Sequence, residues 1–177
     1  YDLVLLPLGW LGAALSIATV YATSMIYAQL KTVPRWNTSL TSLLFVLLSL
    51  TGGALLSAQT STALILLILS GVVQVTYWVL GDNALNKSGT NMATATGLGG
   101  QGSVRAFEPP HTGTNYLLRE FVHIVGRKHA AKLRIISLIL MIGTPILLLS
   151  LSFNIVLIFL AAFSHIGGLF VSRWLFF

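Results

Sequence analysis

The sequence of 177 residues contains no cysteine. This absence excludes disulfides, and it excludes thiolate-bound metals and iron–sulfur clusters held by the chain itself. Charged residues are also scarce, since they make up 8% of the chain, whereas soluble domains contain about a quarter. Together with a hydrophobic content of 55%, this scarcity excludes a soluble globular domain and predicts an integral membrane protein.

Negative charge is the rarer sign, with four Asp and Glu against ten Lys and Arg and a formal net charge of +6. A basic chain suggests nucleic-acid binding when its cations lie on a polar scaffold. Here the cations separate long uncharged runs instead. We therefore expect partners in the membrane and no nucleic acid.

These uncharged runs predict the fold. The run 3–30 exceeds the roughly 20 residues that a helix needs to cross a ~30 Å hydrocarbon layer. The run 36–81 would be roughly 70 Å long as one helix, so it must fold back, and the polar residues 58–62 are the natural turn. The same reasoning places a turn at 150–154. The prediction is an all-α integral membrane protein with about five transmembrane helices. They lie near residues 3–30, 39–57, 63–80, 134–151 and 155–173.

A long polar segment, 81–133, separates the third and fourth spans. Its part 87–102 consists mostly of small and polar residues, which bury too little apolar surface to become ordered without a partner. Thr114 is a suitable cap for a helix near 115–131, whose charged residues fall on one side and whose aliphatic residues fall on the other. We expect this amphipathic helix to lie in the membrane interface, and residues 1–177 to form a single membrane domain.

The distribution of cations predicts the orientation. We call the face of the membrane reached after the first span side A, and the predicted topology places all ten Lys and Arg there. By the positive-inside rule, side A with its basic loops is cytoplasmic. The alternative is that this basic face is a docking surface for an acidic partner on either side of the membrane.

Several segments carry a resemblance to a known family. They are residues 21–31 with Pro34-Arg35-Trp36, the block 108–120 that begins Glu-Pro-Pro-His-Thr-Gly-Thr, and the terminal Arg-Trp-Leu-Phe-Phe at 173–177. On these segments most of the chain resembles the dimethyl sulfoxide reductase anchor subunit family. Five generic spans would not share the loop block or the terminal motif. The chain departs from the family pattern at Ser172, where members often carry an acidic residue.

The resemblance implies a subunit of a complex iron–sulfur molybdoenzyme in the bacterial inner (plasma) membrane. Family members have about eight spans, so this chain would be the C-terminal five-span fragment of a longer subunit. The family anchors a molybdopterin catalytic subunit and a four-cluster iron–sulfur subunit. It oxidises a membrane quinol, menaquinol or ubiquinol, in anaerobic respiration and passes the electrons to the clusters. The anchor itself carries no haem and no iron–sulfur cluster.

Quinol oxidation requires a proton acceptor, a role that imidazole and carboxylate groups fill. His123 and Glu120 are three residues apart, so they lie on one face of a helix and can touch. We predict that His123 takes the first proton and that Glu120 orients its ring. Arg119 and Arg127 on the same face would keep the carboxylate charged and contribute to quinol binding. The alternative is a solvated polar face of an interfacial helix, because mixed charges at this spacing are common.

Three more residues are candidates for quinol binding. Arg35 and Trp36 follow the turn at Pro34, where a ring beside a cation suits a quinone head group, a phospholipid or a plain lipid-facing anchor. His165 is ionisable and lies inside a predicted span, so it is either functional or a neutral imidazole bonded to a neighbouring helix. Pro145 should kink the fourth span. No metal site is expected, and no haem, because His165 has no second buried histidine to face it.

Two other functions remain open at this stage. A polytopic transporter would be favoured by broken helices or charges at mid-membrane, and the spans have neither apart from Pro145 and His165. A structural membrane subunit without a redox role is the other alternative.

Overall fold

In this computed structural model the described residues are 2–105, 107, 113, 124–152 and 154–176, and every regular element among them is helical. The long unbroken helices are α1 (Asp2–Ala28), α2 (Ser39–Leu56), α3 (Thr60–Asp82) and α10 (Ile155–Trp174). One more span is assembled from α8 (Ala130–Leu138), the π-helical segment η2 (Ile139–Gly143) and α9 (Thr144–Leu151). In the described residues, five stretches are therefore long and apolar enough to cross a membrane, which confirms the predicted fold class.

Polar residues end one span and begin the next, as the sequence predicts. The Thr38 hydroxyl caps α2 by accepting a hydrogen bond from the Leu40 N–H at 3.4 Å. Asn154 caps α10 in the same way, accepting from the Val156 N–H at 2.9 Å. Between α2 and α3, Ala58 adopts a φ of +57° at the predicted turn. These caps satisfy backbone donors that a helix start otherwise leaves unpaired.

The connection between α3 and α8 contains short elements. They are α4 (Ala84–Ser88), α5 (Met92–Thr96), the 3-10 turn η1 (Gly99–Gln101) and α7 (Ile124–Lys128). The start of α5 is a capping box in which Asn91 and Thr94 bond each other's backbone N–H groups, at 2.9 and 2.8 Å. Neither α4 nor α5 buries a residue, so local capping rather than a core holds them.

The interfacial helix predicted near 115–131 does not continue to residue 131. Its residues 115–123 lie outside the described residues. The described remainder, α7, ends at Lys128, and α8 begins at Ala130 after a break at His129. The helix that contains Arg134 begins at Ala130, directly after this break. The fourth span thus starts four residues before the predicted position 134.

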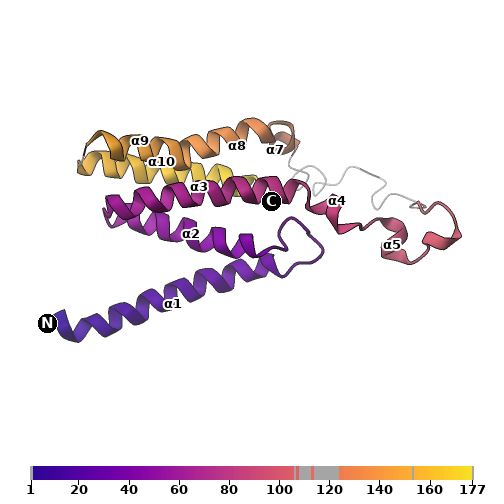
Figure 1. The fold of residues 1–177 in the computed structure, drawn as a ribbon, viewed down its shortest axis with the longest axis horizontal. Helices are drawn as coiled ribbons and strands as arrows, with labels where there is room; N and C mark the ends of the chain where they lie inside the picture. Colours follow the sequence, from indigo (N-terminus) through magenta and orange to yellow (C-terminus); the bar gives the residue numbers. More distant parts are fainter. Residues whose placement is uncertain (1, 106, 108–112, 114–123, 153, 177) are drawn as a thin grey trace.

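The helices form a bundle with α2 and α3 in contact at its centre (Figure 1). On one side α10 packs against α8, η2, α9 and α2, while α1 packs on α2 and diverges from the bundle toward the N-terminus. Trp10, near that end of α1, is 71% exposed. Exposed apolar side chains are expected here, because the surrounding solvent is lipid.

Two buried apolar clusters hold the spans together. One lies near the α2–α3 and α9–α10 turns and contains Ala54, Leu55, Ala63, Leu67, Leu149, Ile158, Ala161 and Ala162. The other lies near the side A end and contains Leu44, Leu48, Tyr77, Trp78, Met141 and Phe176.

Hydroxyl groups add hydrogen bonds between the spans. Thr51 and Ser70 join α2 to α3 through their hydroxyl oxygens at 2.8 Å, and the Ser172 hydroxyl of α10 donates to Gln74 Oε1 of α3 at 3.3 Å. Small polar residues bond helices in this way in membranes, where no water competes.

Candidate functional site

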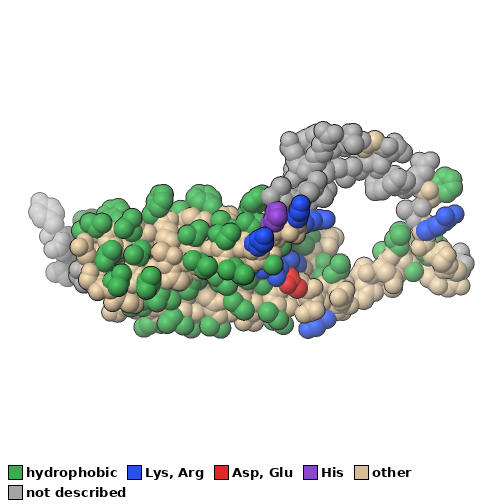
Figure 2. Space-filling view, turned by 90° about the horizontal axis from the view of Figure 1, so that it is seen from above, with side chains coloured by type: hydrophobic (Ala, Val, Ile, Leu, Met, Phe, Trp, Pro, Cys, Tyr) green, Lys and Arg blue, Asp and Glu red, His purple; other side chains and the backbone are tan. Residues whose placement is uncertain are grey.

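The described Lys and Arg side chains gather at the side A end of the bundle and on the segment beyond it (Figure 2). The organising residue there is Asp82, the last residue of α3. It accepts two hydrogen bonds from the Arg134 guanidinium, both at 2.7 Å, and its Oδ1 lies 3.3 Å from Arg35 Nη2. Arg134 also lies 5.4 Å from the centre of the Trp78 ring. One carboxylate therefore ties the α1–α2 loop, the end of α3 and the start of α8 together.

Trp36 belongs to an aromatic cluster at the same end. Its ring stacks on Phe176 at a centroid distance of 5.3 Å and an interplanar angle of 6°, and its Nε1–H donates to the Phe176 carbonyl at 2.9 Å. Tyr27 meets both rings edge to face, at 5.3 and 5.2 Å. Trp36 thus joins the C-terminal residues to the α1–α2 loop.

Arg173 enters this aromatic cluster as a cation. Its guanidinium carbon lies 3.7 Å from the centre of the Phe45 ring and 5.1 Å from that of Phe176. Aromatic faces attract a cation in a partly desolvated site such as this one. The terminal motif therefore closes the side A end of the bundle between α2 and α10.

His165 is fully buried and lies against the irregular part of the fourth span. Its Nδ1 is 2.7 Å from the Met141 carbonyl, and the neighbouring Ser164 hydroxyl donates to the Leu140 carbonyl at 2.8 Å. Pro145 has no N–H to donate to these carbonyls, which lie one α turn and one π turn before it. The α10 side chains therefore pair two carbonyls that Pro145 leaves without a donor, beside the π-helical segment η2, and the His165 Nδ1 carries the proton.

The structure describes only some of the other predicted site residues. His123, Glu120 and Arg119 lie outside the described residues. Arg127 lies in α7, where its side chain is exposed. Two pockets lie at the side A end. Of the predicted site residues that the structure describes, only Arg35 lines one of them.

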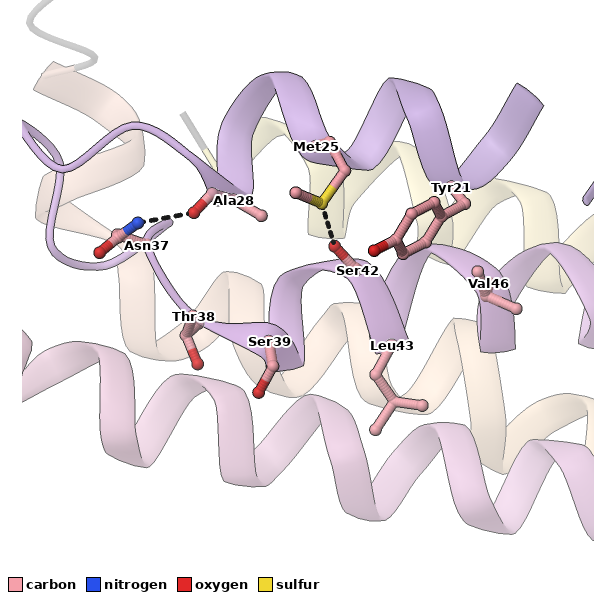
Figure 3. A pocket seen from close by; sticks show the side chains of 9 residues that line it. All are labelled: Tyr21, Met25, Ala28, Asn37, Thr38, Ser39, Ser42, Leu43 and Val46. Atoms are coloured by element: carbon pink, nitrogen blue, oxygen red, sulfur yellow. Dashed lines mark hydrogen bonds between the residues drawn. The ribbon is translucent and has the colours of Figure 1, made fainter. Parts of the chain in front are cut away.

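The larger pocket, here called the α1–α2 pocket, has a volume of about 570 Å³ (Figure 3). It is lined by Tyr21, Met25, Ala28, Asn37, Thr38, Ser39, Ser42, Leu43 and Val46. Its two walls are joined by hydrogen bonds from Asn37 Nδ2 to the Ala28 carbonyl at 2.7 Å and from the Ser42 hydroxyl to Met25 Sδ at 3.5 Å. A mainly apolar pocket of this size with a few polar groups is typical of small-molecule sites.

The second pocket, here called the cationic pocket, lies where the α1–α2 loop meets the end of α3. It has a volume of about 440 Å³. Its lining residues are Lys31, Pro34, Arg35, Asn37, Thr38, Leu40, Tyr77, Leu80, Gly81, Ala84, Lys87 and Ser88. Asn37 and Thr38 separate it from the α1–α2 pocket, because both residues line both pockets.

The family comparison agrees with this membrane architecture. Residues 7–177 match the model of the DMSO reductase anchor subunit family, DmsC. The chain belongs to this family. The predicted resemblance is confirmed, and DmsC membership favours a membrane anchor over a transporter.

One relative of this DmsC-family chain is a sulfite dehydrogenase subunit of Allochromatium vinosum. It is 32% identical over 192 residues, and the alignment covers 99% of this chain and 58% of the relative. The chain thus spans less than two thirds of that relative's length. No solved structure matches the chain.

Sequence reasoning missed two features of the candidate site in this DmsC-family chain. Asp82 gave a usable signal, because it is a single acidic residue at the end of a span among many cations. The α1–α2 pocket gave none, because Tyr21, Met25 and Ser42 are ordinary residues of a span until α1 and α2 are packed together.

Proposed function

We propose that this chain is part of an anchor subunit that binds membrane quinol, oxidises it and passes the electrons to an iron–sulfur partner subunit. That partner would in turn reduce a molybdopterin catalytic subunit. Each quinol loses two electrons and two protons and becomes quinone. The one-electron clusters of the partner take the electrons, and the protons leave on side A, which we propose is the cytoplasmic side of a bacterial inner membrane.

The α1–α2 pocket is the observation that supports this proposal. Quinol is a neutral ring with two hydroxyl groups and an apolar tail, so it suits apolar walls with a few neutral hydrogen-bonding groups. Ser42 supplies a hydroxyl, now bonded weakly to the Met25 thioether, and Tyr21 supplies another. The pocket lies between the two helices of a membrane hairpin, beside lipid-exposed side chains of α1 and α2.

Among the described residues that line the α1–α2 pocket there is no carboxylate and no imidazole, so we propose a proton acceptor from another part of the chain. The pair His123 and Glu120 remains our proposal for that role, with Arg119 and Arg127 holding the carboxylate. Imidazole titrates near neutral pH, so it can take a proton from quinol and release it to water. Of these four residues the structure describes Arg127, which lies in α7, and α7 lies at the same end of the bundle as the α1–α2 loop (Figure 1).

The test compares the same substitution at two positions on one face of α2. Ser42→Leu fills the α1–α2 pocket, whereas Ser49→Leu, seven residues further along, lies outside it. In the purified complex, Ser42→Leu should raise the KM for quinol at least about tenfold, the scale of lost pocket contacts. Ser49→Leu should leave KM near the wild-type value.

A reduced dye that feeds the clusters directly provides the control for folding and assembly, and it should drive both variants equally. His123→Ala should lower quinol-driven kcat by about 10² without changing dye-driven turnover. If Ser42→Leu leaves quinol kinetics unchanged while the complex is intact, the pocket is not the quinol site. If His123→Ala and Glu120→Gln both retain full quinol turnover, the pair is a solvated face.

The reverse direction is a second candidate, favoured by one relative. That protein is named as a dehydrogenase subunit, whereas the family is named for a reductase. A dehydrogenase would deliver two electrons and two protons to quinone through the same pocket. Assaying the complex with quinol and with quinone separates the two, and Ser42→Leu should impair whichever reaction occurs.

A further inference from the structure

The cationic pocket suits a different ligand from the neutral quinol. We infer that it binds the phosphate group of an anionic phospholipid from the side A leaflet, with Arg35 and Tyr77 as the groups that contact the phosphate oxygens. This inference rests on the lining of the cationic pocket alone and is independent of quinol binding in the α1–α2 pocket.

Two buried polar atoms in the lining have no hydrogen-bond partner in the described part of the chain. They are Arg35 Nε and the Tyr77 hydroxyl. Tyr77 is 2% exposed, and although Thr41 lies nearby, the hydroxyl makes no bond of acceptable geometry with it. A buried unpaired donor is costly, so a ligand oxygen that accepts from both groups would be bound favourably.

The charge of the pocket favours an anion. Lys31, Arg35 and Lys87 all line it, and the nearby carboxylate of Asp82 is already bonded by Arg134 as well as Arg35. The arrangement leaves positive charge that a neutral quinol cannot neutralise. Phosphate oxygens are strong acceptors for a guanidinium, and that bond is stronger than one between neutral groups.

The position of the pocket points to a lipid rather than a dissolved anion. It lies where α1 and α3 end, at the level of the head groups, and Leu40, Leu80 and Pro34 form its apolar wall. Leu80 is 47% exposed and Val79 is 57% exposed, so an acyl chain can lie along α3 below the phosphate. Basic residues at this level attract anionic lipids.

Gly81 leaves room for the Arg35 side chain in the wall of the pocket. A Cβ added at Gly81 would lie 3.1 Å from Arg35 Cγ, which is tighter than an ordinary contact. The absence of a side chain therefore lets Arg35 lie flat against the end of α3. A large side chain at position 81 would push the guanidinium out and fill the space for the phosphate.

The test measures lipid affinity of the purified complex by native mass spectrometry. Dioleoyl-phosphatidylglycerol and dioleoyl-phosphatidylcholine have the same acyl chains, so they separate head-group charge from chain contacts. We expect phosphatidylglycerol to bind more tightly. The double variant Lys31→Gln/Lys87→Gln should weaken it about fivefold for each cation removed, the factor equivalent to about 1 kcal/mol.

The matched control is Lys128→Gln/Lys132→Gln, which removes two exposed lysines that do not line the pocket. It should leave phosphatidylglycerol binding unchanged. Tyr77→Phe removes the hydroxyl, keeps the ring beside Phe176, and should weaken binding severalfold, while Gly81→Leu should abolish it. Equal affinity for the two lipids, or an equal loss in the control variant, would overturn the inference. Inorganic phosphate that displaces phosphatidylglycerol at equal concentration would show a free-anion site instead.

Discussion

In the irregular fourth span, a hydrogen bond from α10 to η2 leads to a prediction about stability. Pro145 cannot donate to the Met141 carbonyl, and His165 Nδ1 donates to it from α10 at 2.7 Å. His165→Leu removes that donor and leaves a buried carbonyl unpaired, a loss of about 1–3 kcal/mol in general. It also removes the buried Nε2 atom, which has no hydrogen-bond partner among the described residues, and this offsets part of the loss. We expect His165→Leu to lower the free energy of unfolding by about 1–2 kcal/mol.

The refuting measurement is a double-mutant cycle with Pro145→Ala. An alanine at position 145 regains an N–H that can reach the Met141 carbonyl, so His165→Leu should cost about 1 kcal/mol less in that background. Unfolding of the full-length subunit by SDS in mixed micelles, followed by circular dichroism, gives the four free energies. Ser70→Ala, which breaks the bond to Thr51 between α2 and α3, is the control and should add to Pro145→Ala within about 0.5 kcal/mol. If the free-energy changes of His165→Leu and Pro145→Ala also add within about 0.5 kcal/mol, the imidazole does not replace the missing donor.

The remaining predictions concern packing and orientation. Gly168→Ala would place a Cβ 2.6 Å from Met141 Cβ, so it should destabilise the subunit by about 1–3 kcal/mol, whereas Gly167→Ala has open space and should change stability by less than about 0.5 kcal/mol in the same assay. Equal effects of the two alanines would contradict the close approach of α10 to η2. Cysteines placed at the exposed Ser88 and Ser61 should label differently in intact cells, with an impermeant reagent reaching position 61 and not 88. The opposite pattern would reverse the proposed orientation.

The spans were predictable because lipid imposes a simple rule on sequence. A helix that crosses a membrane cannot carry unpaired charge, and a turn between spans must satisfy its backbone with polar groups. Thr38 and Asn154, which cap α2 and α10, are such groups, and the observed span limits lie within a few residues of the predicted ones. The exception is the start of α8, where charge marked the end of the apolar run but the helix continues to Ala130.

The contacts between helices were not predictable in the same way. Pro145 and His165 each gave a signal, but their connection through the Met141 carbonyl depends on the register of α10 against η2. Asp82 and Arg134 are 52 residues apart in sequence, and no periodicity along the polar connection between them indicates that they meet. A pattern along one helix specifies a face, whereas a site requires the relative rotation and height of two or more helices.

Two of the three segments that carried the family resemblance meet at the side A end, whereas the block 108–120 lies outside the described residues apart from Gly113. Trp36 from the first motif stacks on Phe176 from the terminal motif, and Arg173 lies over Phe45 between them. These side chains contact one another and close the side A end of the bundle. Arg35 differs, because its Nε has no partner among the described residues and its side chain lines a pocket. Ligand chemistry at this end should therefore be sought among residues that face a pocket, of which Arg35, Tyr77 and Ser42 are the first to test.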